Sequence, residues 1–465
     1  MPGHGIRPMI VMKFGGSSIE SAEAVNRVAG IVAARADKHP LVVVSAMGKT
    51  TDRLLEIGHT ASAGDIDTAL AKLDSLRQFH AIEAGGVVSP PAEPAIEKHL
   101  DDHFQELAEL VKGLSILGEL GARSIDALSS YGERLSSVVI TEALRAHGLT
   151  AEHVDSRDVI VTDDRFSQAS PLFDETNQRL SEKVRPLIDA GKIPVMGGFI
   201  ASTKDGITST LGRGGSDFTA SIVGAGLGAE EIQIWTDVDG VLTADPTLVS
   251  SARRIRVMSF AEAAELAYFG ARVLHPSTML PAVRSDIPIR VLNSRKPDVE
   301  GTLIVSEHAA GQSIVKSVAY QEDITVVEVH STRMLMAHGF LKRIFEVFDK
   351  YETAVDMVTT SEVSVSLTID NTSRLSGIVG ELKQFAEVTS VSGQSIVCVV
   401  GDNISYTPGI AARVFRALED INIRMVSQGA SRLNVSLVVD EKDLRATVEA
   451  LHTTFFSEVN EQVFA

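Results

Sequence analysis

The chain has 465 residues, which is too long for one compact core and predicts about three domains. Its 44% apolar and 22% charged residues exclude a disordered chain, and the single cysteine, Cys398, excludes an internal disulfide. The net charge of −18 disfavours nucleic-acid and anionic-membrane binding, and the sequence has no apolar run long enough to span a membrane, so we expect a cytoplasmic protein.

Short apolar runs alternate with helical patterns from residue 9 to about 306, which predicts an α/β fold with a mostly parallel sheet. The predicted strands are 9–14, 41–45, 193–197, 232–235 and 289–292. The predicted helices are 21–35, 126–147, 177–190, 217–227 and 260–269, each with apolar spacing for one buried face.

A glycine-rich turn follows the first predicted strand. Lys13, Gly15, Gly16 and Ser17 precede a predicted helix, so backbone amides and the lysine charge together favour a phosphate site. A plain Gly-Gly turn beside a solvated lysine is the alternative.

Two other glycine patterns are not nucleotide motifs. Gly48 precedes a Lys-Thr pair as in a P-loop, but Val43 stands where that motif requires its first glycine. Gly224, Gly226 and Gly228 have the wrong spacing for a dinucleotide fingerprint, and we interpret them as helix-packing positions.

The second cluster runs from Arg213 through Gly214, Gly215 and Ser216 to Asp217, where a helix begins. A guanidinium between glycines suits a carboxylate or phosphate, although a simple helix cap is the alternative.

Two further segments carry weaker signals. Glu133 lies in a predicted helix with buried flanks, so it needs a cation, which is either Arg134 or another protein cation, or a substrate ammonium. Thr236 and Asp237 follow a predicted strand, where either a nucleotide loop or an ordinary turn fits.

The tail contains an internal repeat. Residues 355–358 and 365–370 recur as 423–426 and 435–440, and Gly339 recurs as Gly409. Each copy reads as strand, helix opening at glycine, strand, strand and helix, which predicts two paired βαββαβ units.

In order, these segments resemble the aspartate kinases of the amino acid kinase family. The resemblance rests on residues 13–17, 45–52, 132–133, 212–217, 235–240 and 269–276, and on residues 359–365 in the tail, which are similar to an effector-binding ACT strand pair. It implies a carbamate-kinase-like three-layer sandwich at 9–308, followed by two ferredoxin-like ACT units at 312–392 and 393–465. The C-terminal end of the second unit is a candidate to complete the first.

The resemblance also implies the roles of individual residues. Lys13 and Asp217 would be catalytic, with ATP and Mg²⁺ as cofactors and L-aspartate as the substrate. The implied substrate contacts are Thr51, Glu133, Arg213, Gly214, Gly215 and Ser216. The implied ATP contacts are Lys13, Gly15, Gly16, Ser17, Thr236, Asp237, Leu242, Arg272 and Val273. Leu242 and Thr247 depart from the family pattern, which often has an aromatic residue and an arginine there.

L-lysine is the expected feedback effector, in a homodimer joined through the ACT units or a tetramer. The implied effector contacts are Met334, Gly339, Phe340, Leu341, Asp356, Ser361 and Glu362. Threonine is the competing effector. The competing functions are another amino acid kinase, acting on glutamate or acetylglutamate, and a ligand-sensing regulator with an inactive kinase domain.

Overall fold

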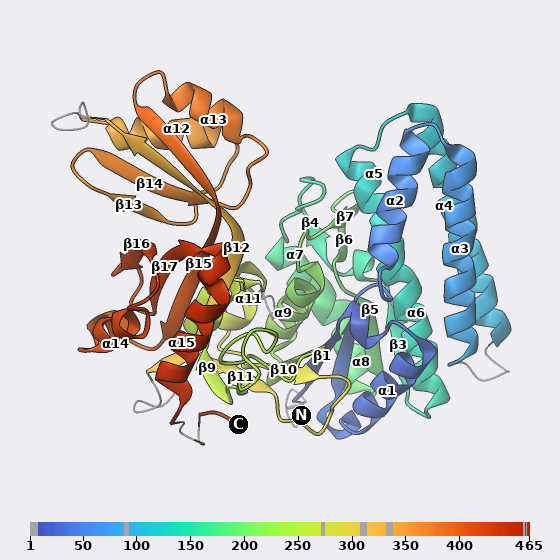
Figure 1. Cartoon of the computed structure of the whole chain (residues 1–465). Coiled ribbons are helices and arrows are strands. Elements are labelled where there is room, and N and C mark those ends of the chain that lie inside the picture. The colour runs from blue at the N-terminus through green and yellow to red at the C-terminus, as the bar shows by residue number, and fades with distance from the viewer. Residues whose placement is uncertain are drawn as a thin grey trace. The chain divides into compact units, whose positions relative to one another are not determined.

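The computed structural model describes residues 8–87, 93–270, 275–306, 314–331, 338–458, 461 and 463–465 (Figure 1). Contacts divide the chain into a first unit, Met1–Gly240 with Leu274–Ser306, and a second unit, Val241–Val273 with Glu307–Ala465. Within the described ranges, no helix is long and apolar enough to cross a membrane.

The first unit is built on a mostly parallel sheet with the strand order β3-β5-β2-β1-β8-β10-β11. Among the described strand pairs of this sheet, β10–β11 is antiparallel and the others are parallel. The five predicted strands are confirmed as β1, β2, β5, β8 and β10, while β3 and β11 were not predicted. The bounds are β1 (Ile10–Phe14), β2 (Pro40–Val44), β3 (Ala151–Val154), β5 (Ile193–Gly197), β8 (Glu231–Thr236), β10 (Ile289–Asn293) and β11 (Thr302–Val305).

Alternation along β1 sorts its side chains between two helical layers. Ile10, Met12 and Phe14 join a core that includes residues of α1 (Ala22–Ala33) and α6 (Tyr131–Ala146). Val11 faces α9 (Gly215–Leu227), where a Cβ added to Gly224 would lie 3.7 Å from Val11 and 2.7 Å from Ile232. The sandwich is therefore three layers deep. The packing interpretation is confirmed for Gly224 and for Gly226, whose added Cβ would lie 2.7 Å from Leu180, but it is wrong for Gly228, which ends α9 at φ 66° with open space around it.

Two predicted helices are interrupted. The helix predicted at 126–147 is α5 (Ala122–Ser129) and α6, which meet at Ser130, because the Ser129 and Ser130 hydroxyls donate to carbonyls of the preceding turn. The helix predicted at 177–190 is α7 (Phe173–Arg179), a π-helical turn at Leu180–Val184, and α8 (Arg185–Asp189), whose Pro186 has no N–H to donate.

The remaining elements of the first unit frame its site. They are α2 (Thr50–Ser62), α3 (Ile66–Gly85), α4 (Glu93–Leu117), α11 (Pro276–Arg284) and a small sheet of β4 (Val161–Thr162), β6 (Ile200–Thr203) and β7 (Thr208–Thr210). Figure 1 shows α3 and α4 packed side by side, next to α2.

The second unit contains a six-stranded antiparallel sheet with the order β13-β14-β12-β15-β17-β16. The predicted repeat is confirmed, because Gly339 (φ 81°) and Gly409 (φ 88°) open equivalent helices in the left-handed region that favours glycine. The elements are β12 (Val315–His330), α12 (Phe340–Lys350), β13 (Val358–Thr360), β14 (Ser364–Ile369), α13 (Leu375–Leu382), β15 (Glu387–Gly401), α14 (Ile410–Ala417), β16 (Ile423–Gln428), β17 (Asn434–Asp440) and α15 (Leu444–Phe456).

The two long strands β12 and β15 run through both copies of the repeat. The second half of β12 pairs with β14 and with the start of β15, whereas its first half pairs with the end of β15, which in turn pairs with β17. The domain boundaries at 308, 312 and 392 stay predictions. The segment before the tail contributes β9 (Val257–Ser259) and α10 (Phe260–Tyr268). A capping box between Ser259 and Glu262 forms the N-terminus of α10.

Candidate active site

A cleft of about 460 Å³ in the first unit lies at the carboxyl ends of β1, β2 and β5, the edge where open α/β sheets bind ligands. Sequence segments more than 200 residues apart meet there. Nine of the predicted site residues line it: Lys13, Gly16, Thr51, Glu133, Arg213, Gly214, Gly215, Ser216 and Asp217.

Lys13 and Asp217 form an ion pair in the cleft. The Lys13 Nζ lies 2.6 Å from Asp217 Oδ1, and both side chains are largely buried. The pair follows from the fold, because Lys13 shares the α9-facing side of β1 with Val11, and Asp217 lies in the first turn of α9. A cation is thereby fixed beside a helix N-terminus, which suits the phosphates of a nucleotide.

The glycine turn after β1 packs tightly against the loop after β2. A Cβ on Gly16 would lie 2.9 Å from the Ala46 carbonyl oxygen, and the Gly48 N–H donates to the Gly16 carbonyl at 3.1 Å. Gly15 donates to the Trp235 carbonyl, and a Cβ there would lie 3.7 Å from Lys13 Nζ. Glycine is therefore needed at position 16, where a Cβ would meet backbone oxygens of the loop after β2, whereas a Cβ at position 15 would make only an ordinary contact.

Glu133 lies in the first turn of α6 and is only 3% exposed. Its Oε1 accepts a hydrogen bond from the Ala46 N–H at 3.1 Å, whereas Oε2 is buried with no donor among the described residues. Burial raises the pKa of Glu133 to about 8. Arg134, the alternative partner considered from sequence, pairs with Glu106 at 3.1 Å instead, so that alternative is wrong.

Arg213 is exposed at the rim of the cleft. Among the described residues its guanidinium has no hydrogen bond or ion pair, and the turn that carries it has Gly212 and Gly214 at φ 73° and 70°. Ser216 packs so closely against Gly198 that a Cβ on Gly198 would lie 2.6 Å from the serine Cβ. The loop is thus held firmly while its cation stays available to a bound anion.

Comparison with known proteins agrees with this geometry. The pattern of the amino acid kinase family matches residues 8–293, and an ACT domain pattern matches residues 397–455. Lysine-sensitive aspartokinase 3 of Escherichia coli is 36% identical over 96% of this chain and 99% of its own length, and the chloroplastic aspartokinase 2 of Arabidopsis thaliana is 38% identical over 98% and 85%. The chain belongs to the aspartokinases of the amino acid kinase family.

Solved aspartokinase structures superpose closely on this chain. E. coli aspartokinase III in complex with aspartate and ADP, described as the R-state, superposes with a TM-score of 0.83 at 35% identity, covering 96% of this chain and all of that one. The same enzyme with lysine and aspartate, described as the T-state, gives a TM-score of 0.82 at 35% identity and covers 96% and 99%. The predicted family, fold class and aspartate kinase activity are confirmed.

Sequence reasoning missed Asp126, which organises the wall of this aspartokinase cleft. The side chain is fully buried and accepts from the Ser167 N–H at 2.9 Å, the Thr210 N–H at 3.0 Å and the Thr210 hydroxyl at 2.7 Å. Burial raises the pKa of Asp126, and this effect outweighs the hydrogen bonds, which lower the pKa. Asp126 therefore connects α5 to the segment that leads into Arg213.

Two more residues that sequence reasoning missed line the cleft, and both have strained backbone conformations. Ser167 has φ 71° and Phe199 has φ 63°, a region that non-glycine residues rarely occupy. The Phe199 N–H donates to Thr219 and its carbonyl accepts from the Leu211 N–H, so hydrogen bonds hold it there. No local sequence signal marks either position.

The predicted nucleotide contacts are placed unevenly. Thr236 and Asp237 follow β8 and hydrogen-bond to each other at 3.2 Å. Leu242 falls in the second unit, where its carbonyl accepts from Ser317, and Ser17 lies in a short 3-10 turn after Gly15. Arg272 and Val273 lie outside the described residues. All of these nucleotide roles stay predictions.

Thr247 stands where relatives usually have an arginine, and the structure gives it a local role. Its N–H and hydroxyl both donate to Asp245 Oδ1, at 2.8 and 2.6 Å, while the Tyr320 hydroxyl donates to Oδ2 at 2.9 Å. The Asp-Pro-Thr segment is therefore a turn that the hydrogen bonds from Thr247 to Asp245 stabilise.

The predicted effector residues lie in the first ACT copy. Gly339, Phe340 and Leu341 begin α12, Asp356 precedes β13, and Ser361 and Glu362 form the turn between β13 and β14. Met334 lies outside the described residues. Asp356 Oδ2 is buried without a donor in the described chain, and burial followed by the charge of Asp370 raises the pKa of Asp356 to about 7.

Proposed function

We propose that the protein transfers the γ-phosphoryl group of ATP to the β-carboxylate of L-aspartate, giving 4-phospho-L-aspartate. The observation that carries the substrate assignment is the buried Glu133 carboxylate, whose Oε2 has no donor in the described chain. An ammonium group satisfies that oxygen, and the unpaired Arg213 guanidinium receives an α-carboxylate as a bidentate partner. A free amino acid offers both groups.

Catalysis then consists of positioning and charge stabilisation. Lys13 offsets the charge that develops on the transferred phosphoryl group, and the Gly16 amide holds a phosphate oxygen, while Gly15, whose N–H donates to the Trp235 carbonyl, keeps the backbone beside the lysine. Asp217 keeps Lys13 in place through the 2.6 Å ion pair. The β-carboxylate is already ionised near neutral pH, so no general base is required.

Magnesium accompanies ATP in this proposal. The described residues contain no group of three or more metal-ligating side chains. That fits Mg²⁺, which usually keeps several waters and is bound through one or two carboxylates together with substrate phosphates. Asp217 is the carboxylate in the cleft that would hold it, and the ion would neutralise phosphate charge during transfer.

Two alternatives are separated by one assay. The first alternative is a kinase for another amino acid: acetylglutamate has no ammonium group for Glu133, and glutamate is one methylene longer than aspartate. The second is a regulator with an inactive kinase domain, which would phosphorylate none of these three compounds. We expect hydroxylamine trapping of the acyl phosphate to give hydroxamate with ATP, magnesium and aspartate. Hydroxamate with glutamate or acetylglutamate instead would overturn the substrate assignment.

L-Lysine is the proposed feedback effector, and the two ACT copies provide the argument. In the second copy, Arg424 pairs with Asp440 at 3.7 Å. In the first copy, the equivalent positions are Asp356 and Asp370, so a carboxylate stands where the second copy has its own cation. A ligand with an additional ammonium group suits the first copy, whereas threonine has none on its side chain.

The effector carboxylate would bind at the amides that begin α12, after Gly339. Titration of lysine, threonine and methionine into the hydroxamate assay tests the choice, and we expect inhibition by lysine alone. A homodimer through the ACT units, or a tetramer, and a cytoplasmic location complete the proposal, and light scattering measures the assembly.

A further inference from the structure

A second cavity, of about 150 Å³, lies on another side of α6 in the first unit. It is lined by His99 and His103 of α4, Arg134 of α6, His153 of β3, and Asp155 and Arg157 of the following turn. Its volume is well above the roughly 15 Å³ that one water needs. None of these side chains belongs to the aspartate site, although Arg134 directly follows Glu133.

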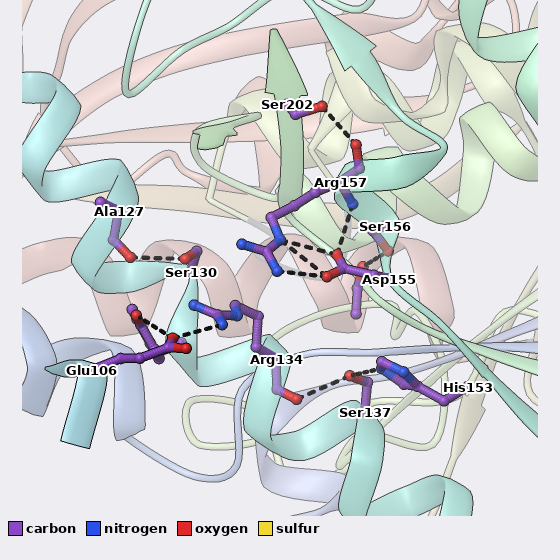
Figure 2. Close-up of polar contacts among 12 residues, drawn as sticks. Glu106, Ala127, Ser130, Arg134, Ser137, His153, Asp155, Ser156, Arg157 and Ser202 are labelled. Atoms are coloured by element: carbon purple, nitrogen blue, oxygen red, sulfur yellow. Dashed lines mark hydrogen bonds and ion pairs between the residues drawn. The ribbon is translucent and has the colours of Figure 1, made fainter. Parts of the chain in front are cut away.

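Both arginines are anchored by carboxylates, and Arg134 also has a buried N–H without an acceptor in the described chain. Figure 2 shows Arg157 forked onto Asp155, with Nε 3.0 Å from Oδ1 and Nη2 2.6 Å from Oδ2. Arg134 donates to Glu106 at 3.1 Å and lies 4.0 Å over the Tyr131 ring, yet its Nε is buried with no acceptor in the described chain. A buried guanidinium N–H without an acceptor is costly, so it favours a ligand that supplies one.

Three histidine rings line the same space and can donate to it when they are protonated. The His99 and His103 rings lie 4.1 Å apart, and His99 Nε2 is buried without a partner among the described residues. His103 Nδ1 lies 2.9 Å from the His99 carbonyl oxygen, which only accepts, so Nδ1 carries the proton. His153 Nε2 lies 3.1 Å from the Ser137 hydroxyl.

The surroundings of these rings disfavour their protonated forms. Burial lowers the pKa of His99 to about 4, and it also lowers the pKa values of His103 and His153, while neighbouring rings and arginines reinforce the shifts. The charged groups that act on the rings are Asp102 and Glu106 from α4, Arg134 and Arg145 from α6, and Asp155 and Arg157. An anion in the cavity opposes these effects and favours protonated imidazoles.

We propose that this cavity binds a small oxyanion of the phosphate or sulfate type, and that the histidines take up protons when it binds. An oxyanion gives acceptors to Arg134 Nε and to imidazole N–H groups in a partly buried setting, where charged hydrogen bonds are strong. A metal ion is disfavoured, because the described residues hold no metal-ligating cluster and two guanidinium groups face the space. The protein carries a net charge of −18, so anion binding must depend on this local arrangement.

Calorimetric titration with inorganic phosphate and with sulfate tests the proposal. The full chain carrying Lys13→Met is used, so that phosphate binding at the kinase site is weakened, and chloride at equal ionic strength is the blank. We expect one saturable site whose affinity rises at least tenfold from pH 8 to pH 6, with proton uptake shown by different heats in two buffers. Phosphate binding without sulfate binding would show that the bound species is phosphate-specific and supports the site.

His103→Phe is expected to weaken phosphate binding at least tenfold. His147→Phe is the matched control, because His147 Nδ1 also lies 2.9 Å from the carbonyl four residues earlier but faces outside the cavity. Arg134→Met gives a second test if circular dichroism shows that His103→Phe does not fold. Absence of saturable binding, or equal binding by the cavity variants and the control, would overturn the proposal.

Discussion

The Lys13 ammonium and the Asp217 carboxylate lie 2.6 Å apart, and they join the central strand of the sheet to the first turn of α9. Because the lysine charge is placed where phosphoryl charge develops, Lys13→Met should lower kcat about 100-fold or more and change the KM for aspartate little. The exposed Lys38, replaced by Met, is the control. A large KM change with an unaltered kcat would mean that Lys13 binds the amino acid instead.

Arg213→Ala should show the reverse pattern. A lost charge-assisted contact costs about 1.5 to 3 kcal/mol, which raises the KM for aspartate by about 10- to 100-fold. Arg213→Lys should recover only part of this loss, because a lysine cannot form the bidentate fork. Steady-state kinetics with aspartate and ATP varied separately measure both effects. Equal losses for both substrates would place Arg213 elsewhere.

The raised pKa of Glu133, about 8, predicts a pH dependence with a definite sign. Free Glu133 is mostly protonated at pH 7, and the substrate ammonium binds the ionised form, so aspartate binding releases a proton. The KM for aspartate should therefore fall roughly tenfold or more from pH 6 to pH 8. Calorimetry in two buffers measures the released proton.

Glu133→Gln is the control for this titration, and it should raise the KM and remove its pH dependence. The substitution should also change how the free energy of unfolding depends on pH. Between pH 4.5 and about 8 the folded protein holds a proton on Glu133 that the unfolded chain has lost, so this group lowers the free energy of unfolding as pH rises through that window. An unchanged pH profile in the variant would contradict the assignment.

Asp126→Asn tests the clamp that sequence analysis missed. The amide that replaces one carboxylate oxygen meets N–H donors from Ser167 and Thr210, so the free energy of unfolding should drop by about 1 to 3 kcal/mol. A looser Thr210 should also displace Arg213 and raise the KM for aspartate. Chemical denaturation and kinetics measure the two effects. Asp164→Asn, at an exposed position in the same loop region, is the control.

The sequence predicted most of this site, because its signals are local. Lys13 with two glycines and Arg213 with three flanking glycines are contiguous patterns, and alternation along β1 determines which face carries Lys13. Asp126 could not be recognised, since its partners lie 41 and 84 residues away and exist only after folding. The interrupted helix at Ser130 was missed for a related reason, because serine hydroxyls that donate back to carbonyls leave no mark in the apolar period.

Asp356 provides the last prediction, which concerns regulation. Burial and the neighbouring charge of Asp370 raise the pKa of Asp356 to about 7, and a lysine ammonium binds the ionised form. Inhibition by lysine should therefore strengthen about tenfold from pH 6 to pH 8. Asp356→Asn should abolish that dependence and weaken inhibition by roughly 10- to 100-fold, while kcat without lysine stays unchanged, because this residue lies in the regulatory unit.

The repeat supplies the matched control for that experiment. Arg424 occupies the equivalent position in the second copy and already pairs with Asp440, so Arg424→Met should leave lysine inhibition as it is. Lysine titrations of the hydroxamate assay at pH 6, 7 and 8 compare the two variants directly. If Arg424→Met relieved inhibition and Asp356→Asn did not, the effector would bind the second copy, and the carboxylate pair of the first copy would have a different role.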